Sequence, residues 1–163
     1  MSLDWKRFWS SYRQKEVTQD EDLFFEVGKT VNGNPVSAEA FQLSVDCIAR
    51  RLDLSKADRL LELCCGNGLV TRCLAPLVAE IEAVDFAEHL IEHAKQFSSV
   101  KNVRYHCTDA IVYLHHLERS HSFKPSKILL GDCLCYFEPS SLAEILRLCR
   151  VLTDDRFVFM ASG

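Results

Sequence analysis

Leu60-Leu61-Glu62-Leu63-Cys64-Cys65-Gly66-Asn67-Gly68-Leu69 is the stretch of this chain that decides its fold. Its apolar run, followed at once by turn residues, predicts a buried strand. Two of the chain's six glycines come next, where they allow a tight turn and let a ligand approach main-chain N–H groups. Apolar residues at helical spacing continue from Leu69. The stretch therefore predicts a strand, a ligand-binding glycine loop and a helix.

The same alternation of short apolar runs and helical patterns continues along the chain. Single helices between strands imply right-handed crossovers and a parallel sheet with helices on both faces. We therefore expect a doubly wound α/β fold whose ligand crevice lies at the carboxyl ends of the strands. Strands are expected over Leu60–Cys64, Ile81–Val84, Val103–Cys107, Lys127–Leu130 and Arg156–Met160.

Several residues are expected to set helix boundaries. Pro76 should kink or shorten the helix after the glycine loop. Pro139 and the capping box Ser141-x-x-Glu144 should begin the last helix. Ser37 is expected to cap an earlier helix, whose apolar face is formed by Phe41, Val45, Ile48 and Leu52.

The N-terminal residues form a separate pattern. We expect one domain over residues 1–163, in which residues 1–36 are a helical extension of an α/β core over residues 37–163. Turn residues over Val31–Pro35 are expected to link the two parts. An aromatic stripe in the extension suits a lid over the ligand, whereas packing into the core is the alternative that such stripes usually favour. The stripe consists of Trp5, Phe8, Trp9 and Tyr12.

Composition narrows the classes of protein. The chain has a net charge of −4 with its basic residues scattered, so nucleic-acid binding is not indicated. No apolar run reaches the length of a membrane span and the first residues lack a signal-peptide core, so we expect a cytoplasmic protein. The eight cysteines lie mostly in apolar runs and are expected as free thiols. Neither their spacing nor that of the histidines suits a metal site, and no histidine is expected to be catalytic.

Asp85 supports the interpretation of the glycine loop as part of a nucleoside-binding site. It ends the second expected strand 19 positions after Gly66, where an acidic side chain meets ribose hydroxyls in nucleoside-binding βαβ units. The alternative is that Asp85 caps the helix over Ala87–Phe97, and the two roles are compatible. Phe86 is expected either to stack on a purine or to pack.

Three motifs together resemble the successive cofactor motifs of class I S-adenosylmethionine-dependent methyltransferases. The resemblance covers about Leu54 to Met160 and implies a Rossmann-like, mostly parallel sheet of five strands in the order 3-2-1-4-5. It also implies S-adenosylmethionine as cofactor and S-adenosylhomocysteine as product. The motifs are Glu62-x-Cys64-x-Gly66-x-Gly68, Val84-Asp85-Phe86 and Thr108-Asp109-Ala110.

The resemblance also implies residue roles. The glycine loop would wrap the methionyl part of the cofactor, with Cys64 in place of the commoner glycine, and Asp85 would take the ribose. Glu62 would orient the loop or meet the cofactor amino group through water. Asp109, with Ala110 beside it, would contact the adenine amino group. Caps and salt bridges are the alternative for Glu62 and Asp109.

The acceptor is expected at the end of the fourth strand. The resemblance places residues such as Asp132 between the cofactor sulfur and the acceptor. Asp132 is therefore both a candidate cofactor-site residue and the candidate general base. The alternative role of Asp132 is a strand-end cap. The box Asp/Asn-Pro-Pro-Tyr of amide and exocyclic-nitrogen methyltransferases is missing here, so a small-molecule acceptor is expected. Gly28-Lys29-Thr30 is expected to place an amide or ammonium near the cofactor carboxylate.

Two other functions compete with a methyltransferase. An NAD-type oxidoreductase is disfavoured because Thr71 stands where the third glycine of its fingerprint belongs. A non-catalytic nucleoside-binding domain is the other alternative. Family members usually continue into strands six and seven, so we expect either a truncated or reduced domain or a homodimer that covers the exposed last strand.

Overall fold

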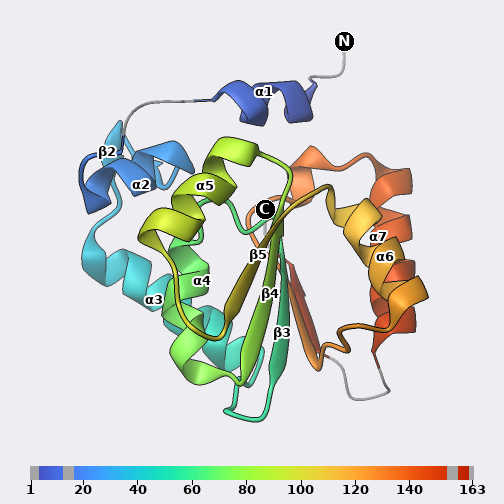
Figure 1. The fold of residues 1–163 in the computed structure, drawn as a ribbon. Coiled ribbons are helices and arrows are strands. Elements are labelled where there is room, and N and C mark those ends of the chain that lie inside the picture. The colour runs from blue at the N-terminus through green and yellow to red at the C-terminus, as the bar shows by residue number, and fades with distance from the viewer. Residues whose placement is uncertain (1–3, 13–16, 154–157, 162–163) are drawn as a thin grey trace.

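The computed structural model describes residues 4–12, 17–153 and 158–161. Its centre is a five-stranded sheet in the order β5-β4-β3-β6-β7, in which all neighbours are parallel (Figure 1). Numbered along the core, this is the expected 3-2-1-4-5 order. The strands are β3 (Arg59–Leu63), β4 (Glu80–Asp85), β5 (Val103–Cys107), β6 (Lys127–Leu130) and β7 (Val158–Ala161).

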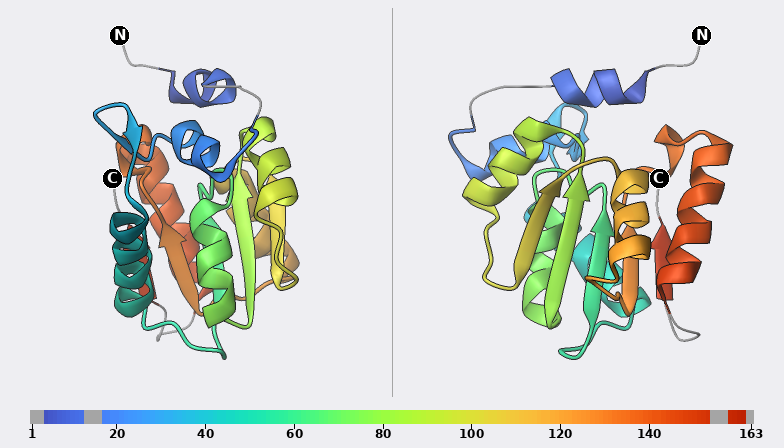
Figure 2. Two further views of the ribbon diagram at one scale, coloured as in Figure 1. Left: turned by 90° about the vertical axis from the view of Figure 1, so that its left-hand side faces the viewer. Right: turned by 45° about the vertical axis from the view of Figure 1, so that its right-hand side comes forward.

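Helices cover both faces of this sheet, which confirms the doubly wound α/β class (Figures 1 and 2). Side chains alternate along β3, so Leu60 packs into one core and Leu61 and Leu63 into the other. One face carries α3 (Ala38–Arg51), α4 (Leu69–Leu74), η1 (Ala75–Leu77) and α5 (Glu88–Phe97). The other carries α6 (Ala110–Ser120) and α7 (Pro139–Leu152).

The N-terminal extension lies over the carboxyl ends of the strands. Its helix α1 (Trp5–Ser11) crosses that end of the molecule, and α2 (Asp20–Glu26) lies beside α5 (Figure 2). The expected linker over Val31–Pro35 is wrong, because β1 (Thr30–Val31) and β2 (Asn34–Pro35) pair as an antiparallel hairpin. Asn32 and Gly33 adopt the positive φ values, 51° and 79°, that a two-residue hairpin turn needs.

Helix boundaries follow three of the four expected signals, including Pro139, which begins α7. Ser37 caps α3, with its hydroxyl accepting from the backbone of Ala40 at 3.2 Å. Pro76 ends the helix after the glycine loop, because α4 stops at Leu74 and the chain continues as the 3-10 turn η1. The capping box is wrong: α7 begins at Pro139 with Glu138 as its N-cap, since proline fixes the helical φ at the first turn.

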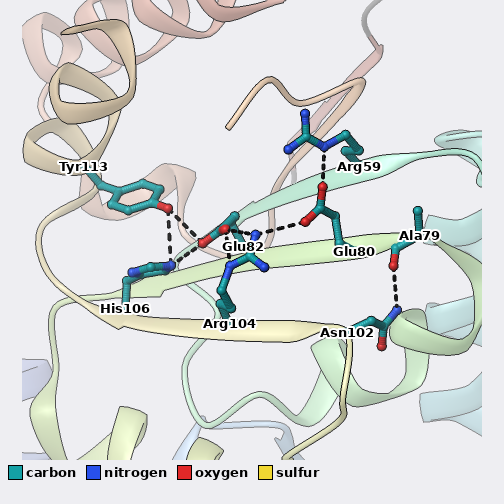
Figure 3. Close-up of polar contacts among 8 residues, drawn as sticks. All are labelled: Arg59, Ala79, Glu80, Glu82, Asn102, Arg104, His106 and Tyr113. Atoms are coloured by element: carbon teal, nitrogen blue, oxygen red, sulfur yellow. Dashed lines mark hydrogen bonds and ion pairs between the residues drawn. The ribbon is translucent and has the colours of Figure 1, made fainter. Parts of the chain in front are cut away.

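A polar network joins β4, β5 and α6 below the ligand end of the sheet (Figure 3). Glu82, only 4% exposed, accepts a hydrogen bond of 2.9 Å from the Tyr113 hydroxyl and also contacts His106 and Arg104. Burial alone would raise the pKa of Glu82, but these three partners outweigh burial and hold its pKa below the usual value. His106 is therefore a structural residue of this network. Within the described residues, no helix is long and apolar enough to cross a membrane.

Candidate functional site

A cavity of about 330 Å³ lies at the carboxyl ends of the strands, and α1 contributes to its lining. Its walls come from the glycine loop, the residues that follow β4, β5 and β6, and the inner side of α1. Eight of the nine residues expected to bind the cofactor line it, so the fold brings together positions up to 70 residues apart. These eight are Glu62, Cys64, Gly66, Asp85, Phe86, Asp109, Ala110 and Asp132.

The glycine loop reverses the chain between β3 and α4. Cys64 and Gly66 have φ values of 61° and 57°, in the left-handed region that favours glycine. Cys64 thus adopts the conformation for which the resembling family commonly uses glycine, at a cost of about 1 kcal/mol. The loop is tied to the neighbouring strand, because the Cys65 N–H donates to the Val84 carbonyl at 3.0 Å.

Gly68 is the ninth expected residue, and it is absent from the lining that the described residues form. It instead packs behind the loop, where an added Cβ would lie 2.5 Å from the Tyr105 hydroxyl and 3.0 Å from the Ser98 Cβ. Gly68 is the N-cap residue of α4 and has a φ of 74°. Gly68 therefore lets α4 approach β5 closely, which is a packing role.

Asp85 joins the glycine loop to the turn after β4. Its Oδ2 accepts from the Gly66 N–H and its Oδ1 from the Ala87 N–H, both at 2.9 Å. Ala87, rather than Asp85, is the N-cap residue of α5, so the capping alternative is wrong in that form. Burial raises the pKa of Asp85, and the two backbone hydrogen bonds oppose this rise.

Asp109 occupies the matching position after β5. Its Oδ1 caps α6 by accepting from the N–H groups of Ile111 and Val112, at 2.9 and 3.3 Å. Its Oδ2 lies 2.6 Å from the Lys6 ammonium of α1. Burial raises the pKa of Asp109, but Lys6 and the backbone donors outweigh it and hold the pKa below its usual value.

Glu62 is the most deeply buried acid of the cavity wall. It is 4% exposed, and its Oε2 has no hydrogen-bond partner among the described residues. Burial raises the pKa of Glu62 to about 7, although the positive charge of Lys29 acts in the opposite direction. A buried carboxylate oxygen without a donor, such as Oε2, is a site for a cationic or N–H-bearing ligand group.

Asp132 is paired with a residue from the N-terminal extension. Its Oδ2 lies 2.6 Å from the Lys29 ammonium, and its φ of 54° turns the chain after β6. The side chain of Lys29 is 22% exposed, whereas that of Asp132 is 65% exposed. The helical turn η2 (Leu134–Tyr136) that follows has Cys133 as its N-cap residue and no side-chain cap. The strand-end cap stays a predicted alternative role of Asp132.

The aromatic stripe of α1 covers the cavity. Trp5 and Trp9 both line it, and their rings lie 4.7 and 5.6 Å from the ring of Tyr136. Phe8 and Tyr12 stack on each other at 4.8 Å on the outer part of the stripe. None of the residues of α1 is buried, and neither core cluster includes the stripe, so the expected packing into the core is wrong. The stripe lines the cavity instead, and its role as a lid stays a prediction.

Asn67 is a structural residue that sequence reasoning missed. It is fully buried, and its Nδ2 donates to the Leu23 carbonyl at 2.8 Å and to Glu26 Oε2 at 2.9 Å. Glu26 also pairs with His93 of α5 at 2.6 Å. The glycine loop is thereby fastened to α2, which leads directly into Lys29.

The thiols of the cavity wall are not activated, and the pair of acids that contacts His115 lies away from the cavity. All eight cysteines are free thiols. A hydrogen bond with Cys133 and burial raise the pKa of the Cys64 thiol, and burial raises that of Cys65, so neither is an activated nucleophile. His115 pairs with Glu118 and Glu144 on the outer surface of α6 and α7.

The sequence profile of the methyltransferase domain family matches residues 60–155. The chain belongs to this family. The matched region runs from β3 to the end of α7 and contains every loop that lines the floor of the cavity. The resemblance found in the cofactor motifs is therefore confirmed.

Curated relatives of this methyltransferase-family chain match over a short segment. A malonyl-(acyl-carrier protein) O-methyltransferase of Bacillus anthracis is 47% identical over 62 residues, which are 37% of this chain and 23% of the relative. The corresponding protein of Bacillus cytotoxicus is 42% identical over 64 residues, 38% of this chain and 22% of the relative. The matched segment thus spans less than a quarter of these relatives.

Solved structures match over more of the domain but with low identity. A S-adenosylmethionine-dependent methyltransferase from Anabaena variabilis superposes with a TM-score of 0.64 at 15% identity, covering 97% of this chain and 59% of that one. The N-methyltransferase NodS from Bradyrhizobium japonicum gives 0.62 at 17% identity, covering 76% and 68%. These likenesses establish the shared fold.

Proposed function

We propose that this methyltransferase-family domain binds S-adenosylmethionine and transfers its methyl group to a small-molecule acceptor, leaving S-adenosylhomocysteine. The observation that carries the proposal is the convergence of Glu62, Asp85 and Asp109 on one cavity at the carboxyl ends of adjacent strands. Each acid has the position that the family motifs give it. Their spacing along the cavity follows the order of the strands β3, β4 and β5.

The residues present fit the cofactor in charge and hydrogen-bonding capacity. Glu62 offers an unpartnered buried carboxylate oxygen to the amino group. Each oxygen of Asp85 accepts one N–H and keeps a lone pair for a ribose hydroxyl. Asp109 would take the adenine amino group on the oxygen that now holds Lys6. Phe86 and Ala110, which follow Asp85 and Asp109 in the chain, also line the cavity.

When bound, the cofactor supplies a methyl group on a positively charged sulfur. Because this charge is dissipated during transfer, the domain needs alignment and water exclusion more than a strong oxyanion site. Trp5, Trp9 and Tyr136 form an aromatic cover that excludes water from this end of the cavity. Asp132 lines the cavity. The family resemblance would put it on the acceptor side, where it would orient the acceptor or receive its proton.

The curated relatives guide the choice of acceptors to be tested. Their names describe methylation of a malonyl group carried on acyl-carrier protein. A carboxylate acceptor is already a nucleophile and needs no general base, which suits a site where the candidate base Asp132 is paired with Lys29. Malonyl thioesters therefore belong in the first acceptor panel.

Calorimetric titration tests the proposed cofactor. We expect the purified chain to bind S-adenosylmethionine and S-adenosylhomocysteine but not NAD, and we expect Asp85→Ala to abolish this binding. Asp46→Ala is the matched control, because Asp46 is exposed on α3 and bonds only locally to Gln42. NAD binding alone would move the chain to the oxidoreductase class. Binding of both sulfur ligands without turnover of any acceptor would favour a non-catalytic domain.

Location and assembly are further parts of the proposal. We place the protein in the cytoplasm and propose a homodimer through the edge of β7, which pairs with β6 on its other side. Light scattering of the purified chain tests the dimer, and a monomer at micromolar concentration would exclude it. We propose no nucleic-acid partner.

A further inference from the structure

Lys29 is held rigidly above the strand ends although it lies in the N-terminal extension. Its N–H donates to the Phe24 carbonyl at 2.9 Å, and its carbonyl accepts from the Val36 N–H at 3.1 Å. Two contacts connect the preceding helix α2 and its C-cap to the glycine loop. The buried Asn67 side chain donates hydrogen bonds to Leu23 and Glu26. Val27 packs against Gly66, where its Cγ1 would lie 3.0 Å from an added Cβ. The backbone of Lys29 is thus held beside the cavity that its side chain lines.

The Lys29 ammonium acts on two acids of the cavity wall. It forms an ion pair of 2.6 Å with Asp132, and its charge lowers the pKa of the buried Glu62. Because the Asp132 side chain is 65% exposed, water competes for this ion pair and its net stability is small. Lys29 can therefore exchange Asp132 for another carboxylate at little cost.

The methionyl end of the proposed cofactor carries both an ammonium and a carboxylate. Glu62 complements the ammonium, whereas the backbone N–H groups of the glycine loop carry only partial charge. Lys6, the other lysine of the cavity lining, is paired with Asp109, which follows β5 and lies three strands away from Asp132 after β6. Lys29 is the cation placed between Glu62 and the acceptor side.

The geometry points to Lys29 as the residue that binds the α-carboxylate of the cofactor, exchanging its ion pair with Asp132 for one with that carboxylate. This inference rests on the proposed function. Its consequence is an order of events, because Asp132 is released toward the acceptor only when the cofactor carboxylate has taken its place. An empty site would keep Asp132 neutralised, and a loaded site would expose it.

The test compares two ligands that differ in the methionyl end. S-Adenosylhomocysteine carries the α-carboxylate, whereas 5′-methylthioadenosine lacks it and keeps the adenosine and sulfur. We expect Lys29→Met to lower the affinity for S-adenosylhomocysteine by about ten- to a hundredfold and to change the affinity for methylthioadenosine by no more than about twofold. Lys101→Met removes an equal charge from an exposed position at the opposite end of the strands and should change neither affinity.

A second variant gives a change of opposite sign. Asp132→Asn removes the competing carboxylate, and asparagine tolerates the left-handed φ of this position. We expect this variant to raise the affinity for S-adenosylhomocysteine by about two- to fivefold and to leave the affinity for methylthioadenosine unchanged. If Lys29→Met fails to fold, Asp132→Asn still tests whether Lys29 binds the α-carboxylate.

The outcomes separate the inference from the proposed function. Equal loss of both ligands in Lys29→Met would show that Lys29 holds the extension in place, and no loss would show that it stays with Asp132 or serves the acceptor; either overturns the inference. An unchanged affinity in Asp132→Asn also overturns it. If the unsubstituted chain binds neither ligand, the proposed function itself fails.

Discussion

Asn67 donates a hydrogen bond of 2.9 Å from its Nδ2 to Oε2 of Glu26, and both side chains are almost completely buried. This contact joins the middle of the glycine loop to a helix 41 positions earlier in the chain. Because Glu26 also pairs with His93, the extension, the loop and α5 share one polar junction. Asn67 lines the cavity and also holds the glycine loop against α2. The shape of the cavity therefore depends on this side chain.

We predict that Asn67→Ala destabilises the domain by about 2–4 kcal/mol, because it leaves the buried Glu26 carboxylate without this donor. Urea unfolding followed by circular dichroism measures the change. Asn34→Ala, in the exposed hairpin, is the control and should stay within about 0.5 kcal/mol. A loss as small as that of the control would mean that water replaces the Asn67 amide.

Gly68 gives a second prediction, based on steric fit. Gly68→Ala places a Cβ 2.5 Å from the Tyr105 hydroxyl at a φ of 74°, and we expect a loss of about 3 kcal/mol or more. Gly33→Ala shares the left-handed φ, at 79°, but meets nothing within 4 Å, so only about 1 kcal/mol of backbone strain is expected. Thermal unfolding of the two variants compares them. Equal losses would show that strain alone accounts for Gly68.

The order of the sheet and the positions of Asp85 and Asp109 could be predicted because a βαβ unit has fixed geometry. The carboxyl ends of parallel strands meet at one edge, so an acid that ends a strand must face the same crevice as the glycine loop. The N-terminal helix was also predicted from the spacing of its aromatics, but their favoured packing into the core was wrong, because α1 has no buried residue. These features depend on local patterns repeated along the chain.

The contacts of Asn67 and Lys29 could not be predicted, because each pairs with residues far away in sequence. Asn67 occupies the unspecified position of Gly-x-Gly, and Lys29 meets a carboxylate 103 positions later. The hairpin had a usable signal in Asn32-Gly33, but its flanks are too short for an alternating pattern. The expected capping box failed because Pro139 starts α7 two residues earlier.

The two tryptophans of the chain, Trp5 and Trp9, both lie in α1 and both line the cavity. Intrinsic fluorescence therefore reports on the cover of the site. We predict that S-adenosylhomocysteine changes tryptophan emission in a saturable way, with the same affinity as in calorimetry. Tyr136→Ala should shift the emission of the free protein to longer wavelength, because it removes ring contacts worth about 1–3 kcal/mol.

Tyr136→Phe is the matched control for this prediction. It keeps the ring that contacts Trp5 and Trp9 and removes only the hydroxyl, so the emission of the free protein should stay as it is. A red shift of equal size in both variants would assign the effect to the hydroxyl. Emission that does not respond to a ligand seen by calorimetry would mean that α1 is not part of the cover.

Glu62 links pH to both stability and ligand binding. Burial raises its pKa to about 7, above the value of about 4.5 that a glutamate has in the unfolded chain. Between these two values the folded protein binds more protons than the unfolded chain, so stability falls as pH rises through this window. Glu62→Gln removes the effect. We expect the variant to gain roughly 2–3 kcal/mol relative to the parent between pH 5 and pH 8.

The same carboxylate makes ligand binding release a proton. A ligand ammonium beside Glu62 favours the ionised form, so S-adenosylhomocysteine binding near pH 6 should expel the proton that burial keeps on the free protein. Calorimetry in two buffers with different ionisation enthalpies measures this release. It should vanish in Glu62→Gln and persist in Glu92→Gln, whose side chain is exposed on α5. Proton release that survives in Glu62→Gln would assign the titrating group elsewhere, because glutamine has no proton to lose at this pH.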